Sequence, residues 1–280
     1  MTLTVDPSGQ ACGARVTGVD LAGDLDAESV AAIRAVWLEQ QVLAFPGQRM
    51  DDDALERFTL AMGGFGEDPF FDPIEGRQNI AAIQREADET APLFAENWHS
   101  DWTFLPHPPA GTCLLSVEIP SHGGDTLFAN QIAAFAALPA SRQDELRALT
   151  AIHSARGAYA PDGAYGEKDE GRSMAIRPSE AAYATQTHPL VRRHPETGEE
   201  GLFSCLGYIV GIEGMDEAQA LGLLTELYQW QTKDEFIYRH SWEPDMLVMW
   251  DNRSVLHKAT GGYEGQRREL HRTTIAAYAG

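Results

Sequence analysis

A histidine and an aspartate stand two positions apart in the string NWHSDWTF, residues 97–104. If this segment is a strand, or the extended end of one, the side chains of His99 and Asp101 point to the same face. An imidazole and a carboxylate on one face supply two of the three protein ligands of a facial iron(II) site. The third ligand must be a distant histidine, so the pair predicts a metal site only together with a second motif.

His257 has the surroundings best suited to that third ligand among the nine histidines of the chain. It follows an apolar run and a turn in the string MLVMWDNRSVLHKAT, residues 246–260. A side chain in that setting can project from a rigid element. Several of the other histidines stand in turns or beside prolines, where such support is weaker.

Two arginines follow in the string QRRELHRTTI, residues 266–275. If this segment is a strand, Arg268, Leu270 and Arg272 share one face, and Arg267 points the other way. Two guanidinium groups on an inward face are costly unless they meet anions. The pattern therefore predicts two carboxylate-like ligands close to the metal.

Length and charge restrict the class of protein that carries these motifs. A chain of 280 residues can form one β-barrel or β-sandwich domain. Its net charge of −21 makes nucleic acid and anionic membranes poor partners. The same charge means that an anionic substrate requires a local basic pocket.

The cysteines and the amino terminus indicate the compartment. Cys12, Cys113 and Cys205 are far apart and odd in number, which indicates reduced thiols rather than a disulfide framework. The first residues, MTLTVDPSGQ, lack the basic start and apolar run of a signal peptide. No apolar stretch is long enough to span a membrane. We therefore expect a cytoplasmic protein.

Many short apolar runs alternate with a few helical patterns along the chain. The predicted helices begin after Asp26 and cover 52–62, 131–138, 141–150 and 216–232. The predicted strands cover 15–21, 41–45, 112–119, 125–129, 236–242, 246–250 and 273–278. The stretch 159–177 reads as a long loop of the kind that forms lids. Short strands with helical decoration predict a mainly β fold with flanking helices, of the sandwich or jelly-roll type.

Four separated strings resemble the taurine dioxygenase family of iron(II)/2-oxoglutarate-dependent oxygenases, which includes the phenoxyacetate herbicide-degrading enzymes. They are NWHSDWTF, PSHGGDTLFAN, WDNRSVLHKAT and QRRELHRTTI, and the likeness runs from about Gly13 to Tyr278. The resemblance implies a double-stranded β-helix, that is, a jelly roll or cupin-like barrel. It would form one domain over 1–280, with an N-terminal αβ segment and lid loops around 67–95 and 155–180.

The resemblance also implies roles for individual residues. His99, Asp101 and His257 match the iron ligands, and Thr126 and Arg268 match the residues that bind 2-oxoglutarate. Arg272 matches a position that contacts the acidic group of the primary substrate in several members of the family. The implied reaction consumes oxygen and 2-oxoglutarate, releases succinate and carbon dioxide, and hydroxylates a C–H bond. Desaturation or ring formation would use the same ligands and stays open.

The stretch GEDPFFD, residues 66–72, departs from the taurine enzyme, which holds its substrate with a histidine and a tyrosine there. Asp68 and Phe71 stand near those two places. We expect a substrate with an acidic group for Arg272 and an otherwise apolar or amine-bearing body, and we do not expect taurine. The further residues predicted to line its pocket are Trp102, Phe104 and Tyr159.

Other functions and the assembly of the protein also have to be considered. The same His-Asp-His set could serve a metal-dependent hydrolase, and a jelly roll could also be a non-catalytic binding protein. Asp251, Asn252 and Arg253 are expected to fix a turn rather than to touch the substrate. The protein is expected to form a homo-oligomer, a dimer or a tetramer, and to take a small-molecule anion as its partner.

Overall fold

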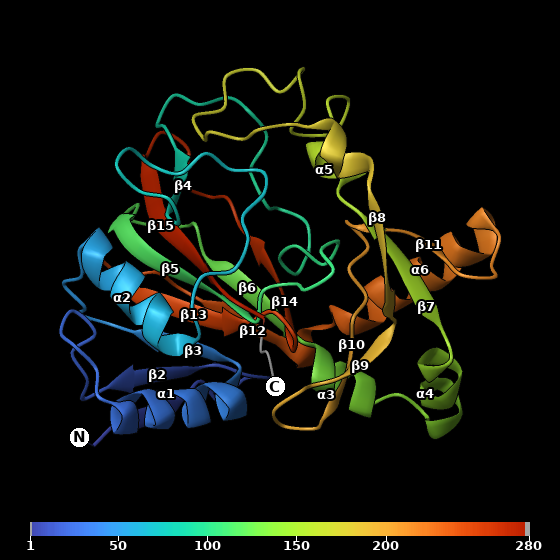
Figure 1. The fold of residues 1–280 in the computed structure, drawn as a ribbon, viewed down its shortest axis with the longest axis horizontal. Helices are drawn as coiled ribbons and strands as arrows, with labels where there is room; N and C mark the ends of the chain where they lie inside the picture. The colour runs from blue at the N-terminus through green and yellow to red at the C-terminus, as the bar shows by residue number, and fades with distance from the viewer. Residues whose placement is uncertain (1, 278–280) are drawn as a thin grey trace.

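The computed structural model describes residues 2–277, and its apolar runs form four β-sheets with helices on their outer sides (Figure 1). The strands of the first half are β1 Thr4–Pro7, β2 Ala14–Thr17, β3 Val42–Phe45, β4 Ala81–Arg85, β5 Gly111–Glu118, β6 Thr126–Asn130 and β7 Thr150–Ser154. Those of the second half are β8 Thr185–Pro189, β9 Val191–Arg193, β10 Glu200–Leu202, β11 Ile209–Ile212, β12 Ile237–His240, β13 Leu247–Asp251, β14 Val255–Ala259 and β15 Arg268–Ile275. The helices are α1 Ala27–Gln40, α2 Asp52–Met62, α3 Gln131–Ala136, α4 Ala140–Arg147, α5 Arg156–Tyr159 and α6 Glu217–Gln231, with 3-10 turns η1 Glu180–Tyr183 and η2 Asp234–Phe236.

The largest sheet has seven strands in the order β1-β2-β3-β13-β5-β15-β4 and is antiparallel except between β2 and β3. Its central strands are buried on both faces. In β3, Leu43 and Phe45 pack against α1 and α2, while Val42 and Ala44 face the opposite side. The two helices cover the outer face of this sheet in Figure 1. This double burial explains why the strand reads as a continuous apolar run.

A second sheet, β12-β6-β14, packs against the inner face of the large one. Phe128 and Tyr238 of this sheet share a buried cluster with Leu114, Val248 and Trp250 of the large sheet. Two facing sheets with a common apolar core form the sandwich expected from the sequence. The open end of this sandwich carries the side chains that were predicted to do chemistry.

A third layer lies beside the sandwich and is built from the middle of the chain. It contains the sheet β11-β7-β8, the pair β10-β9 and the helices α3, α4 and α6. Figure 1 shows this layer on the right, with the loops that follow α2 and α5 at the top of the view. Those loops fall within 67–95 and 155–180, the segments predicted as lids.

The predicted helices and the predicted cap Asp26 are confirmed, whereas several strand limits were wrong. Asp26 and Asp51 cap α1 and α2 by accepting hydrogen bonds from the backbone amides of Ser29 and Ala54. The last strand begins at Arg268 rather than at residue 273, and the predicted end at Tyr278 lies outside the described residues. The predicted helix 141–150 ends earlier because residue 150 opens β7.

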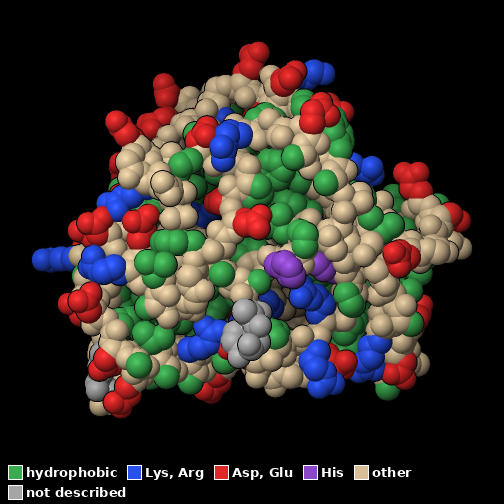
Figure 2. All heavy atoms as spheres, viewed as in Figure 1, with side chains coloured by type: hydrophobic (Ala, Val, Ile, Leu, Met, Phe, Trp, Pro, Cys, Tyr) green, Lys and Arg blue, Asp and Glu red, His purple; other side chains and the backbone are tan. Residues whose placement is uncertain are grey.

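Acidic side chains are spread over the rim of the face shown in Figure 2, while its centre is mainly hydrophobic. Arginine and lysine side chains also occur near that centre. Within residues 2–277, no helix combines the length and the hydropathy needed to cross a membrane.

Candidate active site

His99, Asp101 and His257 converge at the open end of the sandwich. Their potential ligand atoms all lie within 4.8 Å of one another. The Nε2 atoms of His99 and His257 are 3.8 Å and 3.7 Å from the same carboxylate oxygen of Asp101. Two imidazole nitrogens and one carboxylate at this separation form the donor set of a facial iron(II) site.

Backbone pairing between two distant segments holds these side chains in place. The amide of His257 in β14 donates to the carbonyl of His99 at 2.7 Å, and the amide of His99 donates back at 3.0 Å. The sequence left open whether His99 and Asp101 lie on a strand or at its extended end. His99 forms an isolated bridge, and Asp101 already belongs to the turn that follows. The bridge and the turn place both side chains on one side nonetheless.

Asp101 is oriented by a buried chain of hydrogen bonds that reaches β13. The Thr112 hydroxyl donates to its second carboxylate oxygen at 2.5 Å, and the side-chain amide of Asn252 donates to Thr112 at 2.9 Å. The indole N–H of Trp250 fixes the Asn252 oxygen at 2.9 Å. Such outer partners hold a metal-binding carboxylate in a single orientation.

The surroundings favour the protonation states that a metal requires. Burial lowers the pKa of His99, and burial together with His99 lowers the pKa of His257 to about 3. Burial alone would raise the pKa of Asp101, but His257, Arg272 and other neighbours outweigh it and lower that pKa. Neutral imidazoles and an ionised carboxylate are the forms that bind a cation.

Arg268 is a buried cation without a carboxylate partner among residues 2–277. Its side chain comes from β15, and its Nη2 donates a long hydrogen bond of 3.4 Å to the Gly124 carbonyl. Its Nε is buried without a hydrogen-bond partner in the described part of the chain. Burial lowers its pKa. A guanidinium in this state needs an anion to offset its desolvation.

Thr126 lies at the same end of the cavity and is held by Trp242. The indole N–H of Trp242 donates to the Thr126 hydroxyl oxygen at 3.0 Å, and the guanidinium carbon of Arg268 lies 5.6 Å from the centre of the Trp242 ring. Because the hydroxyl oxygen already accepts this bond, its own hydrogen is free to donate to a ligand. Thr126 and Arg268 thus present donors to one place.

Arg272 is also buried and inward-facing, but an acidic side chain of the same protein pairs with it. Its Nη2 donates to Asp68 at 2.6 Å, and its guanidinium lies 4.3 Å and 5.2 Å from the ring centres of Phe71 and Trp102. Arg268, Leu270 and Arg272 share the inward face as predicted. Arg272 was expected to bind the acidic group of the substrate, but in the structure it is paired with Asp68.

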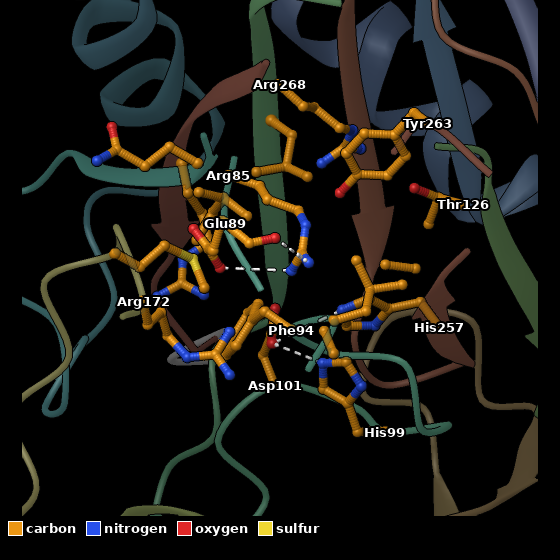
Figure 3. Close-up of a pocket in the computed structure, with 18 of the residues that line it drawn as sticks. Arg85, Glu89, Phe94, His99, Asp101, Thr126, Arg172, His257, Tyr263 and Arg268 are labelled. Atoms are coloured by element: carbon orange, nitrogen blue, oxygen red, sulfur yellow. Dashed lines mark hydrogen bonds and ion pairs between the residues drawn. The ribbon is translucent and has the colours of Figure 1, made fainter. Parts of the chain in front are cut away.

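These groups line one cavity between the sandwich and the lid segments (Figure 3). His99, Asp101 and His257 lie together at one side, with Thr126, Tyr263 and Arg268 at another. The cavity wall is completed by Ile83, Gln84, Arg85, Glu89, Leu93, Phe94, Ala95, Leu114, Arg172, Met174, Trp250, Ala259 and Arg272. Four arginines around one cavity provide the basic pocket that an acidic protein requires for an anion.

The other residues predicted for the substrate pocket lie beside this cavity rather than on its wall. Phe71, Trp102 and Phe104 belong to a buried aromatic cluster behind Arg272. Tyr159 joins that cluster and lines a second recess, which shares Phe94, Ala95 and His99 with the first cavity.

Sequence reasoning missed Arg85, Glu89 and Arg172 on the lid side. Arg85 continues the alternation of Ala81 and Ile83 in the run AAIQR, which was a detectable strand signal. The segment 67–95 therefore contains a strand, β4, and is not loop throughout. Arg172 stands in an irregular Gly-rich stretch, where no pattern marks it.

The sequence and the structure are similar to those of known oxygenases. Residues 4–274 match the family described as taurine catabolism dioxygenase TauD, TfdA family. The alpha-ketoglutarate-dependent sulfate ester dioxygenase of Pseudomonas putida is 33% identical over 99% of this chain and 90% of its own length. The alpha-ketoglutarate-dependent 2,4-dichlorophenoxyacetate dioxygenase of Cupriavidus pinatubonensis is 34% identical over 98% of both chains.

A solved structure agrees with this result. The crystal structure of a taurine dioxygenase from Burkholderia xenovorans superposes with a TM-score of 0.81 and 29% identity, over 99% of this chain and 92% of that chain. This likeness confirms the predicted jelly-roll fold.

Proposed function

Because this chain belongs to the TauD/TfdA family of iron(II)- and 2-oxoglutarate-dependent dioxygenases, we propose that its His99–Asp101–His257 cluster is the iron site of such an enzyme. Alpha-ketoglutarate, named in its relatives, is 2-oxoglutarate. The observation that carries the proposal is the meeting of this cluster with a buried, unpaired Arg268 in one cavity. A hydrolase or a non-catalytic binding protein would not require a buried, unpaired arginine beside the metal site.

The residues fit both groups that the reaction requires. Two imidazole nitrogens and a carboxylate suit iron(II) and leave other coordination positions open for ligands. Arg268 and Thr126 suit the distal carboxylate of 2-oxoglutarate, since a planar guanidinium fork and a hydroxyl donor match a planar anion. The orphan Nε of Arg268 gains a partner in that arrangement.

Each side chain then has a positioning task. When bound, iron(II) and 2-oxoglutarate supply the oxidising chemistry, in which oxygen and 2-oxoglutarate give succinate, carbon dioxide and a hydroxylated substrate. Thr112 holds Asp101 in its ligating orientation, and the Asn97 carbonyl accepts from Nδ1 of His99, so that Nε2 keeps its lone pair. The apolar side chains of Ile83, Leu114 and others keep bulk water away.

We propose a small sulfate ester, sulfonate or aryloxy carboxylate as the primary substrate, and not taurine. Support comes from relatives that act on a sulfate ester and on 2,4-dichlorophenoxyacetate, and from the apolar wall formed by Leu93, Phe94 and Met174. Taurine has no apolar body to fill such a wall. Hydroxylation of the carbon next to an ester or ether oxygen would give an unstable product that separates into a carbonyl compound and the free anion or phenol.

Two measurements test the proposal. Anaerobic addition of iron(II) and 2-oxoglutarate to the protein is expected to give a weak visible charge-transfer band that His99→Ala abolishes. Succinate release is then measured with hexyl sulfate, 2,4-dichlorophenoxyacetate, an alkanesulfonate and taurine. Absence of the band in a folded, metal-binding protein argues against the dioxygenase site, and fast turnover of taurine alone argues against the substrate class.

We also propose that the protein is a cytoplasmic homo-oligomer, a dimer or a tetramer. The family resemblance supports the oligomer, and the three cysteines, all buried and free of disulfides, suit a reducing compartment. Sedimentation velocity tests the first point and cell fractionation the second. A monomer at micromolar concentration would contradict the oligomer.

A further inference from the structure

Arg272 has its charge balanced inside the protein. Its ion pair with Asp68 is short, at 2.6 Å, and the ring centres of Phe71 and Trp102 lie 4.3 Å and 5.2 Å from its guanidinium carbon. A substrate anion that used Arg272 would have to compete with this carboxylate, and displacing it would leave Asp68 largely buried without its partner. Such a displacement is costly. The acidic group of the substrate therefore needs another cation.

Arg85 is the cation that the cavity offers for this purpose. In the β4–β15 ladder Arg85 stands directly opposite Arg268, so both side chains project from the same face, and both line the cavity. Directly opposed like charges destabilise a sheet unless an anion lies near them. Figure 3 shows the Arg85 side chain extending into the cavity from the strand.

The internal partner of Arg85 holds it only loosely. Its Nη1 is 3.4 Å from Oε1 of Glu89, longer than the usual charge-assisted bond, and its Nη2 donates to the Glu89 carbonyl at 2.9 Å. The other oxygen of Glu89 already accepts from the hydroxyl and the amide of Ser173. The guanidinium of Arg85 thus keeps donors for a ligand, whereas Arg172 is in a bidentate pair with Asp169.

We propose that Arg85, and not Arg272, binds the acidic group of the primary substrate. This inference rests on the proposed dioxygenase function and names the residue that determines its specificity. The apolar body of a sulfate ester or aryloxy carboxylate would then lie against Ile83 and Phe94, which line the cavity with Arg85. Arg268 keeps the distal carboxylate of 2-oxoglutarate.

Calorimetric titration of the protein loaded with Mn(II) and 2-oxoglutarate tests the assignment, with hexyl sulfate and 2,4-dichlorophenoxyacetate as probes. Arg85→Gln is expected to weaken binding of both probes by about tenfold or more, the loss of a charged hydrogen bond. Its affinity for 2-oxoglutarate, titrated separately, is expected to be unchanged. The double variant Asp68→Asn/Arg272→Gln, which removes both members of the internal pair, is expected to retain probe binding.

Arg267→Gln is the matched control and is expected to leave probe binding unchanged. Arg267 precedes Arg268 in the sequence but pairs with Glu86, Glu118 and Glu269 on the outer surface. Probe binding that survives Arg85→Gln but is lost in the double variant would overturn the inference. A selective loss of 2-oxoglutarate affinity in Arg85→Gln would overturn it too, by assigning Arg85 to the cosubstrate. Failure of the dioxygenase proposal is a separate result, since the wild-type protein would then release no succinate with iron(II), 2-oxoglutarate and oxygen.

Discussion

Arg268 is a buried cation, and the proposed role of binding 2-oxoglutarate would give it an anionic partner. The side chain is only 6% exposed and has no carboxylate within ion-pair distance among residues 2–277. Arg272, four positions further along the same strand, is equally buried but paired with Asp68. Substitution of the two arginines is therefore expected to change the stability of the ligand-free protein in opposite directions.

Replacing Arg268 by Met is expected to raise the melting temperature of the ligand-free protein, because the desolvation of a buried cation without a partner costs on the order of several kcal/mol. The same variant is expected to lose the stabilisation that 2-oxoglutarate gives the wild type, about 2.7 kcal/mol at a hundredfold excess over Kd. Arg272→Met is the matched comparison and is expected to destabilise the protein, since Asp68 loses its partner. Differential scanning fluorimetry measures the melting temperatures of the wild type and both variants, with and without 2-oxoglutarate. A lower melting temperature for Arg268→Met with intact stabilisation by 2-oxoglutarate would contradict the assigned role.

Trp242 is expected to affect the proposed 2-oxoglutarate site through its hydrogen bond to Thr126. Trp242→Phe removes the indole donor at 3.0 Å and frees the hydroxyl to rotate, so the affinity for 2-oxoglutarate is expected to fall about fivefold, equivalent to one hydrogen bond. Titration calorimetry of the Mn(II)-loaded protein measures the change. In a Thr126→Val background the same substitution is expected to have little further effect. Trp230→Phe, which removes an indole bond to the Ala134 carbonyl in another layer, is the control, and additive losses in the double variant would argue against the coupling.

At the scale of elements, the turn between β13 and β14 fixes the start of the strand that contains His257. Asp251 is buried and accepts from the guanidinium of Arg253 at 2.6 Å and from Nε2 of His194 at 2.9 Å. The expectation that Asp251, Asn252 and Arg253 fix a turn is confirmed. Burial alone would raise the pKa of Asp251, but the charge and hydrogen bonds of Arg253 and the bond from His194 lower it to about 2.

Asp251→Asn is expected to lower the free energy of unfolding at neutral pH by about 3 kcal/mol, because a buried ion pair is broken. A carboxyl with a depressed pKa stabilises the fold above its unfolded pKa of about 3.9 and loses that contribution as the pH falls toward its folded pKa. The loss of stability between neutral pH and pH of about 3 is therefore expected to be smaller in the variant than in the wild type. Urea unfolding at both pH values measures this, with the exposed Asp24→Asn as control. An equal acid sensitivity in both proteins would contradict the pKa shift.

The shared face of Arg268 and Arg272 was predictable, although the start of their strand was not. The arrangement of the metal motif was not predictable either. Alternation of Arg268, Leu270 and Arg272 follows from the period of a strand, and the structure keeps it. The positions of His99 and Asp101 depend on a bridge between His99 and the distant His257. Ser100, which lies between them, bonds to Asn252, a residue 152 positions away in the sequence. Local pattern contains no information on such a contact.

The internal partner of Arg272 escaped the sequence reading for a similar reason. Asp68 and Arg272 are separated by 204 positions, and Asp68 was expected to face the substrate instead. Caps such as Asp26 and Asp51 were predictable because they bond to amides three residues away. Helix starts and strand faces thus follow from local chemistry, while the pairing of charges inside the cavity follows from the tertiary fold.

At the scale of the whole molecule, two electrostatic effects oppose each other. The chain carries a net charge of −21, which repels an approaching dianion, whereas Arg85, Arg172, Arg268 and Arg272 attract it once it is inside the cavity. Two of these arginines are already paired with Asp169 and Asp68. The long-range field outside the cavity is therefore set by the acidic surface.

Salt is expected to assist the capture of 2-oxoglutarate for this reason. The Debye length falls from about 30 Å at 0.01 M ionic strength to about 8 Å at 0.15 M, so salt screens the distant acidic surface more than the arginines that touch the ligand. We expect kcat/KM for 2-oxoglutarate to rise by roughly twofold or more across this range, the reverse of ordinary steering toward a basic site. Initial rates of succinate formation at constant pH measure it. Repeating the series with sodium acetate in place of sodium chloride separates screening from competition by a particular anion. A steady fall of kcat/KM in both salts would show that the arginines control approach as well as binding, and that the acidic surface has no kinetic effect.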